Sequence, residues 1–132
     1  MFRVNKLTDY ATVVMVDLVD ANFAIPSQKI ASNTGIPYPT VNKLMKDLLH
    51  AGLVRSHRGV NGGYSLASPA NKITIADIIQ AVEGPIALTN CVNNSPEKCY
   101  YENFCAVQGR WNRVNKAVVN ALNEVTIADM SS

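Results

Sequence analysis

The spacing of apolar side chains in the first half of the chain predicts three helices. Over residues 7–21 the apolar residues recur at steps of three and four, which is the period of a helix with one buried face. The same period returns over residues 28–33, where Ser27 is the expected cap, and over residues 39–51. Because only a short turn beginning at Gly35 separates these last two helices, they predict a helix-turn-helix.

A β-hairpin is predicted directly after the third helix. Residues 53–57 and 64–67 have the composition of two short strands, and the glycine-rich residues 58–63 suit a tight tip between them. A fourth helix follows over residues 74–83, where Gly84 ends the apolar repeat. A hairpin placed after a helix-turn-helix is a wing, so the expected fold is a winged helix-turn-helix, mainly α with one small β-hairpin.

The last part of the chain predicts a long helix with an apolar seam. Residues 90–105 show no apolar period and indicate a loop. Steps of three and four then return at Trp111, Val114, Val118, Ala121 and Val125. Such a seam suits packing against a partner helix. The chain therefore divides into a winged helix-turn-helix at 1–84, a cysteine-bearing loop at 85–105, and a long C-terminal helix and tail at 106–132.

Composition narrows the classes of protein to which this chain can belong. Apolar residues make up 48% of the 132 residues, which is enough for a packed core and argues against general disorder. No apolar run approaches the roughly 20 residues that span a bilayer. Charged residues near the N-terminus do not suit a secretory signal. We therefore expect a cytoplasmic protein without a membrane partner.

The charge is small in total but unevenly distributed. The net charge is +2, so any binding to nucleic acid depends on where the cations lie. Residues 38–64 hold four Lys or Arg and one acidic residue, whereas residues 74–102 hold one Lys and four acidic residues. Phosphate contacts from Lys and Arg supply most of the sequence-independent affinity for DNA. The third helix and the wing therefore favour duplex DNA as the partner.

The residues expected to contact DNA lie at the start of the third helix and on the wing. The N-terminal part of a recognition helix meets base edges, where Asn42 suits adenine, Lys43 suits guanine and Thr40 suits a thymine methyl group. Lys46 suits a phosphate, and Arg58 suits a narrow minor groove. For any one of these cations, simple exposure to solvent is the alternative. The full candidate set is Tyr38, Pro39, Thr40, Asn42, Lys43, Lys46, Arg58 and Asn61.

Three cysteines, Cys91, Cys99 and Cys105, lie within one 15-residue window. In a reducing compartment such a group favours metal or redox chemistry over a structural disulfide. Three thiolates with one further ligand suit an iron–sulfur cluster. Three alternatives stay open: a zinc site, which these spacings match poorly, a metal-free thiol switch, and cysteines that pack only as small apolar residues.

Several short motifs resemble those of a known family. They read LTDY at residues 7–10, GLV at 52–54, RG at 58–59, GGYSL at 62–66 and AVEG at 81–84. With cysteines after the last of them, the chain resembles the IscR and NsrR family of winged-helix regulators over nearly its whole length. The pieces GGY at 62–64, PIALT at 85–89 and TIADM at 126–130 are most similar to the branch that regulates the SUF iron–sulfur assembly system.

This resemblance implies a homodimer, with the C-terminal helix as the dimerisation element, and a near-palindromic operator. It also implies an iron–sulfur cluster, either 2Fe–2S or 4Fe–4S, held by Cys91, Cys99 and Cys105. The sequence departs from the IscR-like pattern in a wider first cysteine spacing and in Gln108, which stands where those members have a histidine ligand. Asp9 matches the aspartate that NsrR-like members supply from the other subunit, so it is the expected fourth ligand.

The expected function is that of a DNA-binding transcription regulator, a repressor that senses iron–sulfur status or oxidative or nitrosative stress and controls iron–sulfur assembly genes. A metal-free thiol-sensing regulator and a winged-helix adaptor for other proteins are the alternatives. An enzyme acting on a small-molecule substrate is not expected. The sequence has no glycine-rich phosphate loop in a strand–loop–helix setting and no Ser/His/Asp order.

Overall fold

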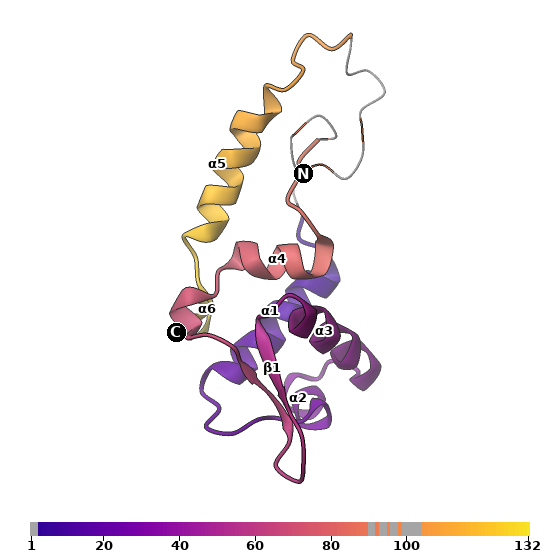
Figure 1. The fold of residues 1–132 in the computed structure, drawn as a ribbon, viewed down its shortest axis with the longest axis vertical. Coiled ribbons are helices and arrows are strands. Elements are labelled where there is room, and N and C mark those ends of the chain that lie inside the picture. Colours follow the sequence, from indigo (N-terminus) through magenta and orange to yellow (C-terminus); the bar gives the residue numbers. More distant parts are fainter. Residues whose placement is uncertain (1–2, 90–91, 93–94, 96–97, 99–103) are drawn as a thin grey trace.

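The computed structural model of the protein describes residues 3–89, 92, 95, 98 and 104–132. Figure 1 shows a body of short helices with a hairpin at one end and a helix that projects from the other end. The elements are α1 (Lys6–Val19), α2 (Ser27–Thr34), α3 (Tyr38–His50), β1 (Val54–His57), β2 (Gly63–Leu66), a 3-10 turn (Ala70–Lys72), α4 (Ile75–Glu83), α5 (Trp111–Asn123) and α6 (Ile127–Ser131). The expected fold class, mainly helical with a two-stranded wing, is confirmed. In the part of the chain that the structure describes, no helix is long and apolar enough to span a bilayer.

The core lies where α1 and α3 bury their apolar faces. The buried side chains are Ala11, Val14, Met15 and Leu18 of α1 and Val41, Leu44, Met45 and Leu48 of α3. Both sets repeat at steps of three and four, so the period read from the sequence marks the buried face. Ile30 of α2 and Ile78 of α4 are also fully buried. Each large apolar side chain buried in this way contributes roughly 1.5–3 kcal/mol.

The turn between α2 and α3 depends on one glycine and two prolines. Gly35 ends α2 with φ +78°, a left-handed conformation that favours glycine. α3 begins at Tyr38, one residue earlier than predicted, with Pro39 in its first turn, where a missing N–H costs no hydrogen bond. The prediction that Ser27 caps α2 was wrong. Ser27 is already helical, because the carbonyl of Pro26 accepts the first helical hydrogen bond from Ile30 at 3.0 Å.

The wing is fixed to the helix-turn-helix by a third piece of extended chain. β1 and β2 pair antiparallel, with His57 opposite Gly63 at the end near the tip. Ile25, just before α2, pairs with Tyr64 of β2 through two backbone hydrogen bonds of 2.9 and 2.8 Å. A Cβ on Gly63 would lie 2.3 Å from the carbonyl carbon of Ile25, so this close approach requires glycine. The start of α2 is therefore held against the wing.

The C-terminal part forms the helix α5, and the stretch after it, where the sequence predicted a tail, contains the short helix α6. α6 begins after a capping box, in which the side chains of Thr126 and Asp129 each accept a hydrogen bond from the other's backbone N–H. Ile127 is fully buried, and its N–H donates to the carbonyl of Ile73 at 2.9 Å. The chain leaves the axis of α5 here because Ile127 has to reach the core. The Thr-x-x-Asp pattern is a sequence signal that identifies this break.

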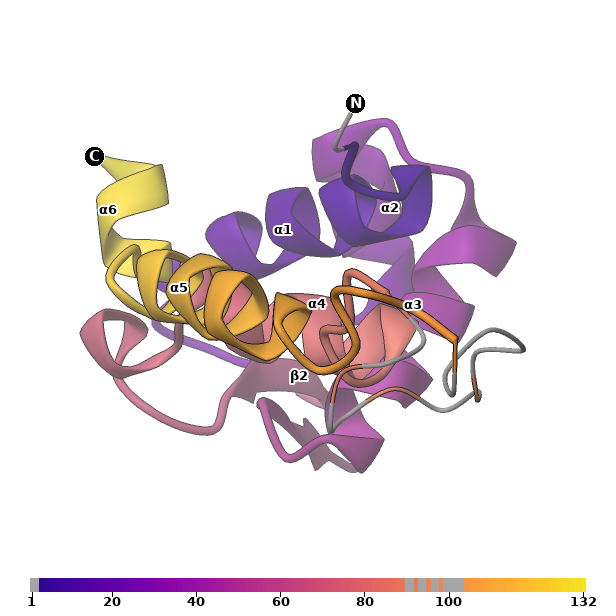
Figure 2. The same cartoon turned by 90° about the horizontal axis from the view of Figure 1, so that it is seen from above.

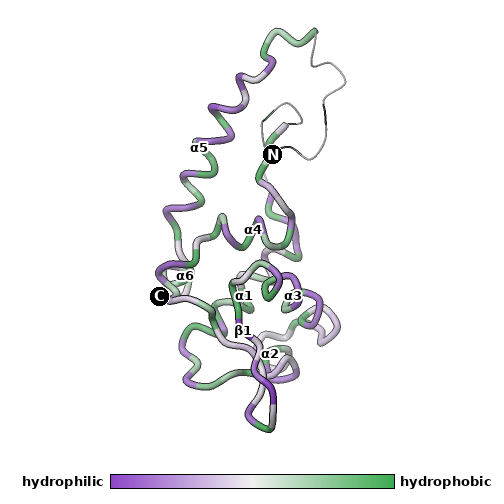
Figure 3. Tube along the Cα trace, in the orientation of Figure 1, coloured by the Kyte–Doolittle hydropathy of each residue, from purple (hydrophilic) through white to green (hydrophobic). Residues whose placement is uncertain are grey.

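α5 is an arm with apolar and polar residues in alternation (Figure 3). Seen from above in Figure 2, it lies over α4, with which it is in contact. Trp111 and Val114 are 38% and 43% exposed, and Val118 and Ala121 continue the predicted seam. Val125, its last predicted member, lies beyond the end of α5. Within the described residues this seam is left partly uncovered.

Candidate nucleic-acid interface

A polar groove of about 460 Å³ lies between the start of α2, the start of α3 and the wing. Its lining residues are Pro26, Ser27, Gln28, Tyr38, Asn42, Ser56, His57, Gly63 and Tyr64. Two of the predicted DNA contacts, Tyr38 and Asn42, are among them. Sequence reasoning missed the others, because they come together only when the wing folds back beside α2.

The predicted reading face of α3 is open. Pro39, Lys43 and Lys46 are exposed on the side of the helix opposite the core stripe, and Thr40 and Asn42 flank it half-buried. A helix with one buried stripe and amide, hydroxyl and ammonium groups on its other faces suits insertion into the major groove. That these five residues contact DNA stays a prediction.

Lys43 is the one residue of this face that has a charged partner. Its Nζ lies 3.1 Å from Oδ2 of Asp47, one turn further along α3. The pair is largely exposed to solvent, so it contributes only about 0.3–0.5 kcal/mol. A base acceptor or a phosphate therefore competes for Lys43 at small cost. Among the described residues this is the only ion pair, which leaves Lys46, Arg55 and Arg58 without a carboxylate partner.

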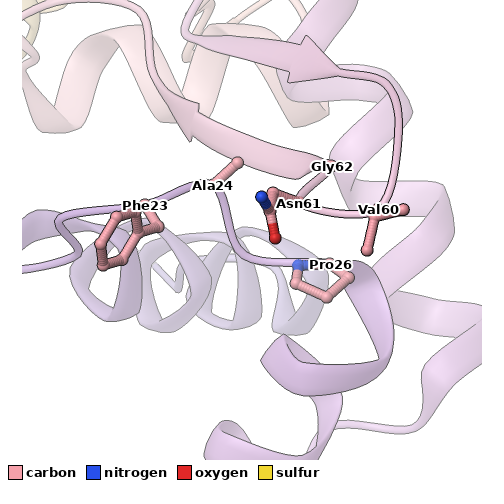
Figure 4. A pocket seen from close by; sticks show the side chains of 6 residues that line it. All are labelled: Phe23, Ala24, Pro26, Val60, Asn61 and Gly62. Carbon is pink, nitrogen blue, oxygen red and sulfur yellow. The ribbon is translucent and has the colours of Figure 1, made fainter.

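Arg58 and Asn61 lie on the exposed tip of the wing, where Gly59 adopts a φ of +103°. Asn61 lines a second cavity, of about 370 Å³, between the wing tip and the loop before α2 (Figure 4). The other lining residues of this cavity are Phe23, Ala24, Pro26, Val60 and Gly62. Asn61 is thus a neighbour of the polar groove and not part of its lining, and Pro26 borders both spaces.

The structure describes only part of the predicted cluster site. Cys105 is exposed and free, whereas Cys91 and Cys99 lie outside the described residues. Asp9 is exposed in the first turn of α1 and lines a mainly apolar cavity of about 360 Å³. No three His, Cys, Asp or Glu side chains among the described residues come close enough to hold a metal ion. The ligand set of three thiolates and Asp9 therefore stays a prediction.

Two side chains that sequence reasoning missed, Thr8 and Asn115, fix the chain where it leaves α4 for the cysteine-bearing loop, called the cysteine segment below. Thr8 of α1 is buried, and its hydroxyl donates to Oε2 of Glu83, at the end of α4, over 2.6 Å. Asn115 of α5 is also buried; its Nδ2 donates to the carbonyl of Ile86 at 2.9 Å, and its Oδ1 accepts from the N–H of Leu88 at 2.8 Å. The segment before the cysteines is thus tied to α1 and to α5.

The order of helix-turn-helix, wing, cysteine segment and C-terminal helices agrees with a family match over almost the entire chain. Residues 4–132 match the family model Rrf2, described as an iron-dependent transcriptional regulator. The chain belongs to the Rrf2 family. This confirms the resemblance to IscR-type regulators. It also confirms that the protein is a DNA-binding transcription regulator and not an enzyme.

Relatives within the Rrf2 family match the chain along most of their length. The transcriptional regulator CymR of Bacillus subtilis is 32% identical over 125 residues, which cover 93% of this chain and 85% of CymR. The solved structure of CymR, named as the global cysteine regulator of B. subtilis, superposes with a TM-score of 0.76 at 29% identity, covering 99% of this chain and 97% of that one. IscR of T. potens gives a TM-score of 0.72 at 29% identity, covering 98% and 85%.

Proposed function

We propose that this Rrf2-family protein is a homodimeric repressor that reads a near-palindromic operator through α3 and the wing. The observation that carries the proposal is the open face of α3, which presents hydroxyl, amide and ammonium groups. Beside it lies a wing whose arginines have no carboxylate partner among the described residues. In this assignment Asn42 pairs with adenine, Lys43 reaches a guanine and Thr40 contacts a thymine methyl group.

The remaining contacts of the proposed interface position the protein on the duplex. Lys46 binds a phosphate, and Arg58 enters the minor groove from the wing tip. Tyr38 and Pro39 approach the DNA at the start of α3, and Asn61 does so beside Arg58. All five of these side chains are exposed, which supports this arrangement.

The homodimer is supported by the uncovered seam of α5. Trp111 and Val114 expose more than a third of their surface on a helix that projects from the body (Figure 1). Apolar residues repeated at steps of three and four suit packing against the same helix of a second copy. Two copies related by a two-fold axis present two reading helices, which is why the operator is expected to be near-palindromic.

We further propose that the cysteine segment senses iron–sulfur status or oxidative or nitrosative stress, and that the target genes serve iron–sulfur assembly. The residues fit such a centre in chemistry, because Cys91, Cys99 and Cys105 supply three thiolates and Asp9 supplies an oxygen ligand. When bound, the cluster supplies a group that reacts with oxygen and nitric oxide. Similarity to IscR of T. potens supports this proposal.

In this proposal Asp9 and Thr8 of α1 connect the state of the cysteine segment to the position of the DNA-reading body. Asp9 lies on α1, whose Thr8 is bonded to the end of α4, so a bond from Asp9 to the cysteine segment of the other subunit would tie that segment to the DNA-reading body. A change in this tie shifts the balance between forms that bind DNA with different affinity.

A second candidate is a metal-free thiol switch. The observation that favours it is the exposed, free thiol of Cys105, together with the likeness to a global cysteine regulator. Oxidation of an accessible thiolate to a sulfenic acid or a disulfide changes the segment without any metal.

The deciding experiment is anaerobic purification followed by a visible absorption spectrum with iron and sulfide analysis. Broad charge-transfer bands with stoichiometric iron and sulfide, lost in Cys99→Ser, are the expected result. A colourless protein after anaerobic reconstitution would overturn the cluster proposal. Loss of DNA binding on peroxide treatment, reversed by a dithiol and absent in Cys105→Ser, would then establish the thiol switch. Binding to duplex DNA that does not depend on salt would contradict the DNA interface itself.

A further inference from the structure

The polar groove between α2, α3 and the wing is lined by hydrogen-bonding side chains. Ser27 and Gln28 come from α2, Tyr38 and Asn42 from α3, and Ser56, His57 and Tyr64 from the wing. None of the lining residues, all within the described part of the chain, is Lys, Arg, Asp or Glu. Hydroxyl and amide groups donate hydrogen bonds to phosphate oxygens, and no carboxylate is present to repel an anion.

The position of the groove relates it to the backbone of a bound duplex. α3 borders it on one side and the wing borders it on the other. In the proposed complex α3 occupies the major groove of the DNA and the wing occupies the adjoining minor groove. One sugar–phosphate strand always separates these two grooves of a duplex. That strand has to cross the space between α3 and the wing, which is where the polar groove lies.

The backbone on the two sides of the groove is joined directly. Two backbone hydrogen bonds join Ile25 to Tyr64, and the close approach of Gly63 to Ile25 leaves no room for a side chain. Pro26 and Ser27 follow directly, so the α2 side of the groove is fixed to the wing side. The backbone that carries the donors is therefore already in position, and only their side-chain rotamers have to be ordered when a ligand binds.

We propose that this groove is a neutral seat for one backbone phosphate of the operator, with Gln28, Tyr38 and Ser56 as donors to its oxygens. The inference rests on the proposed placement of α3 and the wing. It adds residues of α2 and β1 to the interface. Because no cation takes part, this contact contributes affinity without the release of counterions that accompanies Lys or Arg contacts.

The test compares affinity and its salt dependence for Gln28→Ala, Tyr38→Phe and Lys46→Ala. The probe is a duplex of about three helical turns, selected in vitro from a random library with the wild-type protein and followed by fluorescence anisotropy. We expect Gln28→Ala and Tyr38→Phe each to weaken binding about three- to tenfold, as for removal of a neutral hydrogen bond, and to leave the slope of log K against log salt unchanged. Lys46→Ala should reduce that slope by about one, because the ammonium group no longer neutralises a phosphate.

Gln80→Ala is the matched control, since Gln80 is an exposed glutamine on α4 outside the groove. Unchanged affinity in Gln28→Ala and Tyr38→Phe, with wild-type binding intact, would overturn the phosphate seat alone. A reduced salt slope in these variants would show that the contact is not neutral and would also overturn it. Absence of any duplex binding by the wild type would remove the proposed interface, and the seat with it. Inorganic phosphate bound by the wild type at constant ionic strength and lost in both variants, with no change in their DNA affinity, would assign the groove to a free anion and overturn the seat for the operator.

Discussion

At the scale of single residues, Gly63 and Gly52 both have a positive φ but differ in what an added Cβ would meet. Gly63 has φ +143°, and a Cβ there would lie within 2.5 Å of backbone atoms of Ile25 and Pro26. Gly52, just after α3, has φ +79°, but nothing lies within 4 Å of its Cβ position. Both substitutions to alanine strain the backbone, and only the one at Gly63 also forces the wing away from α2.

We therefore expect Gly63→Ala to lower the free energy of unfolding by at least about 2 kcal/mol, and by more than Gly52→Ala does. Urea denaturation of both variants measures the difference. DNA affinity of Gly63→Ala should also fall, because the two sides of the polar groove move apart. Equal losses of stability in the two variants would mean that the wing accommodates the added Cβ at no cost in free energy, which would contradict this prediction.

Base recognition is a second property that belongs to single residues. Asn42→Ala should reduce discrimination among operator variants by about 1–3 kcal/mol at one base-pair position, because alanine cannot form the bidentate hydrogen bonds to adenine. Competition binding with single-position operator variants measures this. Lys46→Ala is the comparison, since removal of a phosphate-binding cation weakens all variants alike. Unaltered discrimination by Asn42→Ala would contradict the base contact.

At the scale of elements, local patterns predicted the helices well, and their ends and partners less well. The buried stripes of α1 and α3 follow from a period that neighbouring residues create among themselves. The start of α2 was misplaced, because Pro26 is held extended by the pairing of Ile25 with the distant Tyr64. The attachment of α5 depends on Asn115, whose amide bonds backbone groups 27 and 29 residues away.

Asn115→Ala should lower the free energy of unfolding by about 1–3 kcal/mol, because the carbonyl of Ile86 and the N–H of Leu88 lose their partner. Thermal or urea denaturation monitored by circular dichroism measures this loss. Asn120→Ala is the control: Asn120 is exposed on the same helix, so that variant reports helix propensity alone. A loss no larger than that of Asn120→Ala would show that the amide contributes nothing net.

At the scale of the whole molecule, the body and the arm have different tasks in the proposed function. The body holds the core, α3 and the wing, and α5 projects from it with its apolar seam partly uncovered (Figure 1). The described residues offer no cover for this seam, which is the reason for proposing a second copy. DNA affinity then depends on the arm, because one chain alone addresses only half of a palindromic site.

Val114→Glu should convert the dimer to monomers and weaken operator binding more than tenfold, since a charge buried in an apolar interface has no partner. Sedimentation or light scattering measures the mass, and anisotropy measures the affinity. Asn120→Glu adds the same charge on α5 away from the seam and should leave both unchanged. A monomeric wild-type protein, or a dimeric Val114→Glu variant, would contradict the role of the seam.

The sequence by itself determined the order of helices and wing, the buried faces of α1 and α3, and the basic stretch at residues 38–64. These features depend on residues within one or two turns of each other, so a local pattern contains them. Only the tertiary structure decided that α6 turns back to the core at Ile127. It alone also brought Gln28 and Ser56 to the lining of one polar groove. Those arrangements join segments far apart in the chain, and the packing of the whole fold, not any local period, selects which of them meet.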